Sequence, residues 1–148
     1  MNHVAALFAL SLLVLPGAPA MAESPRGPAE VVAAFHDALS RGDRASAIEL
    51  LGPDVVIFES GAAERSRKEY ASHHLGADME FAKATRREVV NREVGEAEDA
   101  AWVLTRSRTS GTFRDRPVDL RGTETMLLRK TLDGWRIVHI HWSSAKTK

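Results

Sequence analysis

The sequence predicts one α+β domain, with helices in its first half and strands in its second half. Between residues 29 and 83, apolar side chains recur at helical spacing, interrupted by one short β-branched run. After residue 85, runs of β-branched and aromatic residues alternate with turn residues. Helices followed by a strand meander are typical of helices packed on one face of a curved antiparallel sheet.

The helices are predicted from their spacing and from the residues at their ends. The first begins near Ala29, and Gly42 suits the left-handed conformation that often follows a helix. Asp43 can cap a second short helix, which Gly52 and Pro53 stop. About three helices are expected before the sheet, all on its concave face.

A short buried strand and the third helix come next. Residues 55–58 are β-branched or aromatic and are bounded by turn residues, which predicts the strand. The third helix is predicted over residues 66–83, where Ser66 and Glu69 have the spacing of a capping box.

The remaining elements are predicted to be strands separated by short turns. Gly111 is expected to turn the chain between two of them, and Asp133 with Gly134 is typical of a hairpin. The later strands are predicted at residues 87–94, 100–110, 112–120, 123–130 and 135–142.

Composition excludes several classes of function. The 148-residue chain has no cysteine, which rules out disulfides, thiolate metal sites and a cysteine nucleophile. Its 20 basic and 20 acidic residues cancel, so no charge pattern favours nucleic acid or an anionic membrane. No glycine-rich phosphate loop or Gly-x-Ser-x-Gly elbow is present.

Residues 1–22 are predicted to be a cleavable signal peptide. An apolar run at residues 4–15 is followed by Ala20-Met21-Ala22, an A-x-A cleavage site. The run is shorter than the roughly 20 residues that span a bilayer. We therefore expect a periplasmic or secreted protein with no membrane contact after cleavage, and a flexible lead-in at residues 23–28. An uncleaved anchor is the alternative, because no Lys or Arg precedes the run.

Two segments resemble a known superfamily. Residues 32–43, followed by residues 53–58, look like the N-terminal half of nuclear-transport-factor-two-like (NTF2-like) proteins, including SnoaL-like domains. Residues 133–144 are similar to the last hairpin of these proteins and of the calcium/calmodulin-dependent kinase association domain. The resemblance spans residues 29–144 and implies a cone-shaped cavity and homodimers packed through the outer face of the sheet. Isomerases, cyclases, dehydratases, transport factors and association domains share this fold, so it does not imply one function.

Two histidines on the last predicted strand attract attention. His139 and His141 are two residues apart and would share one face, while Val138, Ile140 and Trp142 would take the apolar face. The first face is unusually polar for a strand expected to be covered on both sides.

A second polar group lies on the third predicted helix. Tyr70, His74 and Asp78 follow one another at four-residue spacing and form a stripe along one helical face. Glu59 follows the first buried strand, and the resemblance implies that this strand ends near the mouth of the cavity.

One interpretation of these groups is a metal site. Glu59, His74, His139 and His141 would supply carboxylate and imidazole ligands, with Asp78 as a further carboxylate. Such ligands suit zinc, copper or non-haem iron.

Two other interpretations stay open. Tyr70, His74 and Asp78 could perform acid–base chemistry on a small carbonyl compound, with Tyr70 as a hydroxyl donor. Alternatively, the histidines satisfy buried polar groups or stabilise a dimer. His36, beside Phe35, is assigned to ordinary helix surface.

Arginines on a later strand predict a ligand contact. If the strand face that carries Arg106 and Arg108 lines the cavity, these residues could pair with Glu124 and bind a carboxylate ligand. Glu59 is predicted to be a further ligand-binding residue. A buried ion pair or a solvated sheet edge is the alternative.

These observations predict an exported protein that binds a small ligand in a polar cavity, and one interpretation adds a divalent metal such as zinc or copper at the His/carboxylate cluster. A cofactor-free isomerase, cyclase or dehydratase is one alternative. A dimerisation module without catalysis is the other.

Overall fold

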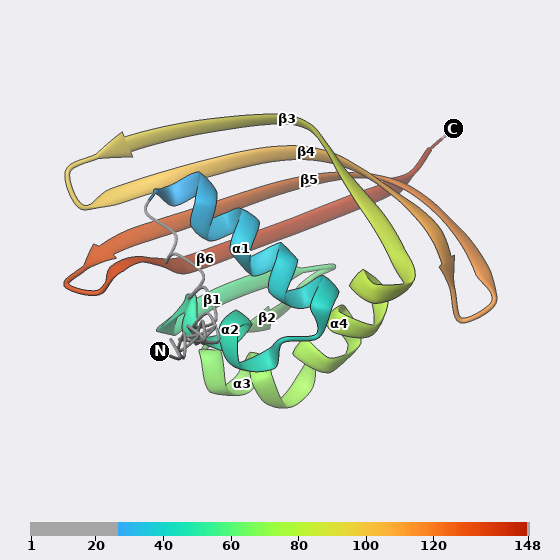
Figure 1. The fold of residues 1–148 in the computed structure, drawn as a ribbon, viewed down its shortest axis with the longest axis horizontal. Helices are drawn as coiled ribbons and strands as arrows, with labels where there is room; N and C mark the ends of the chain where they lie inside the picture. Colours follow the sequence, from blue (N-terminus) through green and yellow to red (C-terminus); the bar gives the residue numbers. More distant parts are fainter. Residues whose placement is uncertain (1–26, 148) are drawn as a thin grey trace, which may run out of the picture.

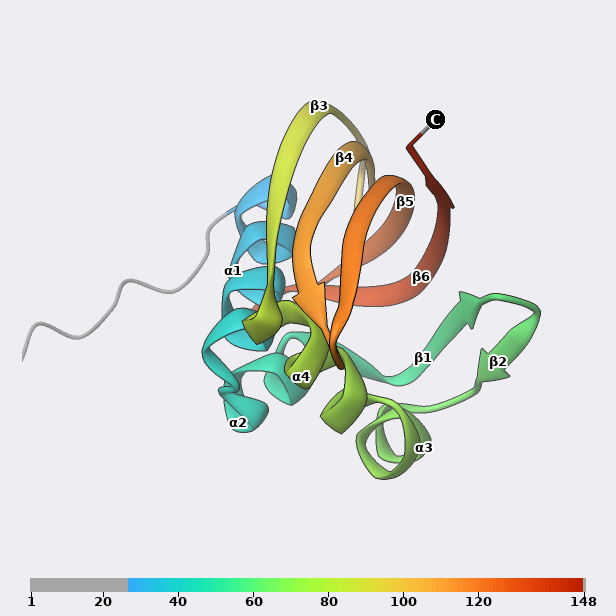
Figure 2. The same ribbon diagram turned by 90° about the vertical axis from the view of Figure 1, so that its right-hand side faces the viewer.

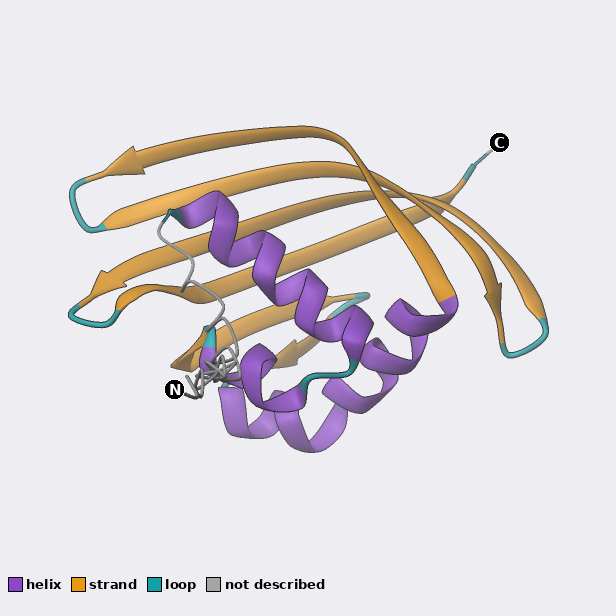
Figure 3. Ribbon diagram, in the orientation of Figure 1, coloured by secondary structure: helices purple, strands orange, loops and turns teal. Residues whose placement is uncertain are grey.

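Four helices cover the concave face of a curved six-stranded sheet in the computed structural model, which describes residues 27–147 (Figures 1 and 3). The helices are α1 (Pro28–Arg41), α2 (Arg44–Glu49), α3 (Arg67–His73) and α4 (Leu75–Ala84). The strands are β1 (Leu51–Glu59), β2 (Ala62–Glu64), β3 (Thr85–Ala97), β4 (Ala100–Phe113), β5 (Arg116–Thr131) and β6 (Gly134–Lys146). The α+β prediction is confirmed.

The predicted signal peptide lies outside the described residues. None of the helices within residues 27–147 combines the length and apolar character needed to cross a membrane.

The sheet is mixed rather than wholly antiparallel. Its strand order is β2-β1-β6-β5-β4-β3, and β1 runs parallel to β6 while the other neighbours are antiparallel. The chain between these two parallel strands includes β2, α3, α4 and the antiparallel strands β3–β5, so β1 and β6 are not joined by a single crossover helix. Figure 2 shows the β1–β2 hairpin extending away from the arched strands β3–β6.

Local sequence explains the first two helices. Pro28 occupies the first turn of α1, and Gly42 ends it with a left-handed φ of 68°. Phe35 and Leu39 lie on the buried face of the helix. Asp43 then caps α2 by accepting a hydrogen bond from the backbone N–H of Ser46, as predicted.

The third predicted helix is broken in two at His74. Its start is confirmed, because the Ser66 hydroxyl accepts a hydrogen bond from the Glu69 backbone. Tyr70 and Leu75 are both fully buried, but residues five positions apart lie on different sides of a straight helix. The break at His74 lets both side chains enter the core.

The strand pattern differs from the prediction at one turn. Gly111 lies inside β4, and the chain turns instead at Arg114 and Asp115, which have left-handed φ values of 49° and 60°. Gly111 is needed for close packing, since a Cβ atom there would lie 2.8 Å from the Ala84 carbonyl oxygen. The predicted strands at residues 112–120 and 123–130 are therefore largely one strand, β5.

A β-bulge changes which side chains of β6 face the core. Ile137 pairs with Leu128 and His139 with Leu127, so Val138 is an extra residue. The extra residue shifts by one position the alternation of side chains between the two faces of β6. Ile137 and Ile140, three residues apart, are therefore both fully buried. The predicted apolar face of this strand was thus right beyond the bulge and wrong before it.

Candidate functional site

A cavity of about 620 Å³ lies between the helices α1 and α4 and the concave face of the sheet. A smaller cavity of about 170 Å³ lies among β1, β2, α3 and α4. Glu59, Asp78 and Trp142 line both cavities, so the two spaces adjoin. We treat them together as the candidate site.

A row of paired residues crosses the concave face from one side of the sheet to the other. Arg92 on β3 pairs with Thr105 on β4, which pairs with Glu124 on β5. Glu124 pairs with Trp142 on β6, and Trp142 pairs with Glu59 on β1. Paired residues of neighbouring strands point to the same face, so the row connects basic and acidic groups across the site.

Glu124 is the most extensively bonded carboxylate of the row. Its Oε2 atom lies 2.6 Å from His36 Nε2 and accepts a hydrogen bond of 2.7 Å from Trp142 Nε1. Arg87 donates to Oε1 at 3.3 Å. Burial by itself would raise the pKa of Glu124, but His36, Arg87 and Trp142 together lower it to about 2. Glu124 is therefore ionised throughout the physiological range.

Asp78 has a different environment. The Tyr70 hydroxyl donates a hydrogen bond of 2.8 Å to Asp78 Oδ2. Burial raises the pKa of Asp78 despite this hydrogen bond and the charge of His74, both of which lower it. Burial also raises the pKa of Tyr70, with the negative charge of Asp78 adding to the effect. The phenol therefore stays protonated and holds the carboxyl group in place.

Glu59 is a second carboxyl group at the junction of the two cavities. Partial burial raises its pKa, and the negative charge of Asp78 raises it further, while His74 opposes the shift. Two neighbouring carboxyl groups with raised pKa values favour a state in which one is charged and the other is neutral.

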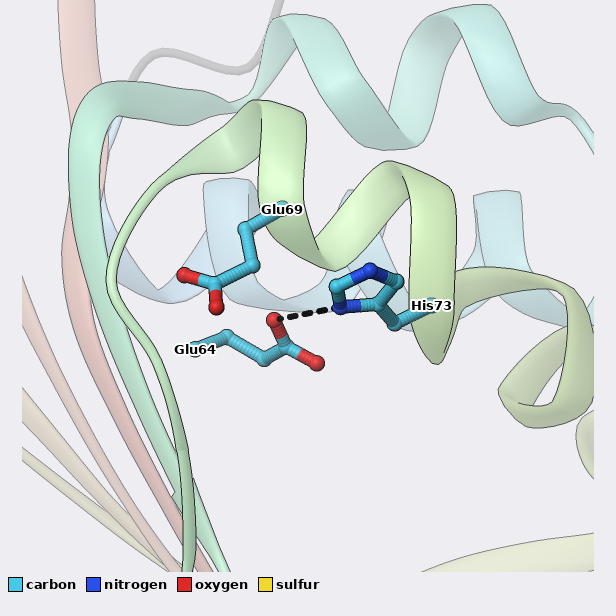
Figure 4. Close-up of side chains that lie close together, drawn as sticks. All are labelled: Glu64, Glu69 and His73. Atoms are coloured by element: carbon cyan, nitrogen blue, oxygen red, sulfur yellow. Dashed lines mark ion pairs between the residues drawn. The ribbon is translucent and has the colours of Figure 1, made fainter.

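His74 faces β2 at the edge of the smaller cavity. Its Nδ1 atom contacts Oε1 of Glu64, and Nδ1 of His73 lies 3.6 Å from Oε2 of the same residue. Figure 4 shows Glu64, Glu69 and His73 converging. Within residues 27–147, these three are the one group of histidine and acidic side chains close enough to share a metal ion, with donor atoms within 4.8 Å.

The predicted metal ligands are not brought together. Glu59 and His74 line the smaller cavity, but His139 and His141 point away from it to the convex face of the sheet. His139 contacts the Val56 carbonyl oxygen at 2.9 Å, and both rings meet Phe58 edge-on. The β6 bulge and the pairing of Phe58 with His141 account for this placement.

The predicted arginine contact is also corrected. Arg106 and Arg108 lie on the convex face, where Arg108 forms a bidentate pair with Asp119 at 3.0 and 3.1 Å. Glu124 faces the cavity and pairs with Arg87 instead. The prediction placed the wrong face of β4 in the cavity: Thr105 and Ser107, which alternate with the two arginines, are the buried residues.

Sequence reasoning missed three cavity residues. His36 was assigned to helix surface, but it lies on the side of α1 that faces the sheet and reaches Glu124. Arg87 and Arg92 both line the cavity because a bulge in β3 shifts the register between Val89 and Asn91. No local pattern in the sequence reveals that bulge.

Known proteins agree with this architecture. Residues 29–147 match the family model of the SnoaL-like domain. A proposed ketosteroid isomerase from Shewanella frigidimarina NCIMB 400 is 37% identical, with a TM-score of 0.74 over 76% of this chain and 91% of that one.

More distant structures share the fold. A proposed dehydratase of the NTF2-like family from Streptomyces avermitilis is 18% identical, with a TM-score of 0.69 over 79% of this chain and 93% of that one. The calcium/calmodulin-dependent kinase II hub of S. rosetta is 25% identical, with a TM-score of 0.63 over 82% of this chain and 99% of that one. No curated protein matches the chain.

Proposed function

The chain belongs to the SnoaL-like domain family, and from this premise we propose that its cavity binds a small carbonyl compound on which Asp78 acts as a general base. The observation that carries the proposal is the hydrogen bond from Tyr70 to a buried Asp78 whose pKa is raised. A carboxyl group tuned in this way is suited to removing a proton from carbon near neutral pH.

The proposed step moves a proton and leaves the atoms of the substrate in balance. Asp78 takes a proton from the carbon beside the carbonyl group, and the electron pair of that bond delocalises into an enolate. Glu59, in its neutral form, donates a hydrogen bond to the carbonyl oxygen. The proton on Asp78 then returns to the same carbon or, in a β,γ-unsaturated ketone, to the γ carbon.

Tyr70 has a positioning role in this scheme. Its side chain is fully buried and its hydroxyl group is directed at Asp78, so the phenol orients the base. The identity of 37% to a proposed ketosteroid isomerase supports the same class of chemistry.

Exchange of carbon-bound protons tests the proposal without knowledge of the natural substrate. The rate at which 4-oxopentanoate, 5-oxohexanoate and 3-cyclohexenone incorporate deuterium beside the carbonyl group would be followed in D₂O by proton NMR. The variants are Asp78→Asn, which can still accept the Tyr70 hydrogen bond, and Asp54→Asn, whose side chain is exposed on β1.

We expect the Asp78→Asn variant to lose about 100-fold or more of the protein-catalysed exchange. The Asp54→Asn variant should match the wild type. Equal exchange in wild type and Asp78→Asn would contradict the proposal. Ligand binding without catalysis would then be the function that the cavity serves.

We also propose that the convex face packs against a second copy of the chain. Trp102, Leu127 and Phe58 are 42%, 42% and 43% exposed there, and His139 lies between the last two. Large apolar side chains grouped on one face are typical of an interface. The similarity to a kinase hub domain supports oligomer formation through this fold.

We further propose that the protein is exported. The apolar run and the Ala20-Met21-Ala22 site support cleavage after Ala22. The intact mass of the protein recovered from a periplasmic or secreted fraction tests this, and a chain that retains its first 22 residues would contradict it.

A further inference from the structure

Arg92 is a cation of the cavity that has no anionic partner within residues 27–147. It lines the larger cavity, and its Nε atom is buried without a hydrogen-bond partner among the described residues. Arg92 is half-buried. Removing its Nε–H from water without a hydrogen-bond partner is costly, and carboxylates are the partners that match the planar donors of a guanidinium group.

Thr105 provides a second polar group without a partner at the same place. It pairs with Arg92 across β3 and β4, and its side chain is only 2% exposed. Its hydroxyl oxygen also has no hydrogen-bond partner within the described part of the chain. Buried polar groups are normally hydrogen-bonded, so two adjacent exceptions beside a cavity need an explanation.

The carboxylate of Glu124, which pairs with the other side of Thr105, is already neutralised. Glu124 receives Arg87, His36 and Trp142, which occupy both of its oxygens. Burial lowers the pKa of Arg87, Glu124 opposes that effect, and the positive charge of Arg92 lowers it further. This end of the cavity therefore carries excess positive charge.

We propose that Arg92, assisted by the Thr105 hydroxyl, binds a carboxylate group of the ligand. This inference rests on the proposed function, in which Asp78 and Glu59 act on the carbonyl group at the other end of the ligand. The substrate class is therefore a keto acid, with its carboxylate towards β3 and its carbonyl group towards β1 and α4.

The row of paired residues limits how far apart those two groups lie. Arg92 and Glu59 are separated by four strand spacings, which is about 19 Å along the sheet at about 4.8 Å per spacing. The sheet is curved and both side chains point into the concave space, so their charged ends are closer than this. A cavity of about 620 Å³ is in the range that encloses a small organic ligand.

The test compares keto acids with their uncharged esters. Binding of 4-oxopentanoate, 5-oxohexanoate and 4-oxo-4-phenylbutanoate, each beside its methyl ester, would be measured by NMR titration. The protein variants are Arg92→Gln, Arg92→Lys and Arg106→Gln, the last as a control on the convex face of β4. Circular dichroism and thermal unfolding establish that each variant is folded.

We expect at least one keto acid to bind the wild type at least tenfold more tightly than its ester. Arg92→Gln should remove that preference and leave ester binding unchanged, whereas Arg92→Lys should keep part of it. The Arg106→Gln control should behave like the wild type.

Failure of this inference is distinguishable from failure of the proposed function. Absence of a preference for any carboxylate, or a preference that persists in folded Arg92→Gln protein, would overturn the role of Arg92. Carboxylate binding that depends on Arg92, without exchange at carbon, would support this inference and contradict catalysis by Asp78. Should Arg92→Gln fail to fold, a preference for the keto acid that is weaker in Arg92→Lys than in the wild type supports the inference. A preference fully retained in Arg92→Lys overturns the role of the Arg92 guanidinium group.

Discussion

Glu124 and Asp78 border the same cavity, yet their pKa values are shifted in opposite directions. Both carboxyl groups are desolvated, which favours the neutral acid. Glu124 has His36, Arg87 and Trp142 to compensate, whereas Asp78 has the Tyr70 hydroxyl as its hydrogen-bond donor. One carboxylate is thus a fixed charge, and the other is a group able to gain and lose a proton.

The ionisation of Glu124 predicts how stability depends on pH. Its pKa is about 2 in the folded state and near 4.5 when unfolded, so the unfolded chain binds its proton first as pH falls. This contribution to stability, on the order of 3 kcal/mol, is complete above pH 4.5 and disappears towards pH 2. Urea unfolding across this window should show a steep loss in wild type and a shallower slope in Glu124→Gln.

Glu96→Gln, an exposed residue of β3, serves as the matched control. It should retain the slope of the wild type. An equal slope in Glu124→Gln would contradict the assignment of that pH dependence to Glu124.

Tyr70 should control the ionisation of Asp78. Its hydrogen bond lowers the pKa of Asp78, so Tyr70→Phe should raise that pKa further. Because Asp78 acts as a base only when charged, the acidic limb of the exchange profile should move to higher pH. Stability should fall by roughly 1–3 kcal/mol, because a buried acceptor loses its donor.

The measurement is the pH dependence of deuterium exchange in wild-type and Tyr70→Phe protein, alongside urea unfolding. An unchanged limb, or one that moves to lower pH, would show that Tyr70 does not tune Asp78.

At the scale of secondary-structure elements, three irregularities shape the site. The break at His74 lets Tyr70 and Leu75 both enter the core, and it leaves Tyr70 facing Asp78 across the junction of α3 and α4. The bulge in β6 sends His139 and His141 to the convex face. The bulge in β3 lets both Arg87 and Arg92 line the cavity.

The start of α3 gives a direct test of local sequence effects. Ser66 accepts a hydrogen bond from the Glu69 backbone, so Ser66→Ala should destabilise the domain by about 1 kcal/mol. Ser72→Ala, an exposed change near the end of the same helix, should have a much smaller effect. Equal losses in thermal or urea unfolding would show that the cap contributes nothing specific.

At the scale of the whole molecule, the two faces of the sheet have separate roles. The helices pack on the concave face (Figures 1 and 3). This face also carries the row of paired residues, from Arg92 to Glu59, that crosses the cavity. The convex face carries Trp102, whose indole lies directly over Gly95, where an added Cβ would come within 2.1 Å. Leu127 pairs with Trp102 at the centre of this apolar area.

The proposed dimer predicts a selective effect at Leu127. Leu127→Lys would bury an unpaired charge in the interface, which is strongly unfavourable. The dimer dissociation constant should therefore rise at least tenfold, which corresponds to a loss of about 1.4 kcal/mol of association free energy. Leu132→Lys, at a fully exposed hairpin tip, should leave the dimer unchanged. Light scattering during size-exclusion chromatography measures both, and a wild-type monomer at all concentrations would contradict the proposal.

The sequence alone determined the features that depend on neighbouring residues. Gly42 and Asp43 separate α1 from α2, Ser66 starts α3, and the turn at Asp133 and Gly134 separates β5 from β6. These features depend on backbone conformation and on hydrogen bonds within a few residues, which composition and spacing reveal. The order of elements then predicts the α+β class.

Only the tertiary structure decided which side chains share the cavity. One extra residue in a strand moves every later side chain to the opposite face of the sheet, and local sequence does not show where a bulge occurs. Glu59, Tyr70 and Asp78 were identified correctly as neighbours, whereas His139, His141, Arg106 and Arg108 point to the other face. The cavity depends instead on His36, Arg87 and Arg92, because contacts between segments far apart in the chain give these residues their environment.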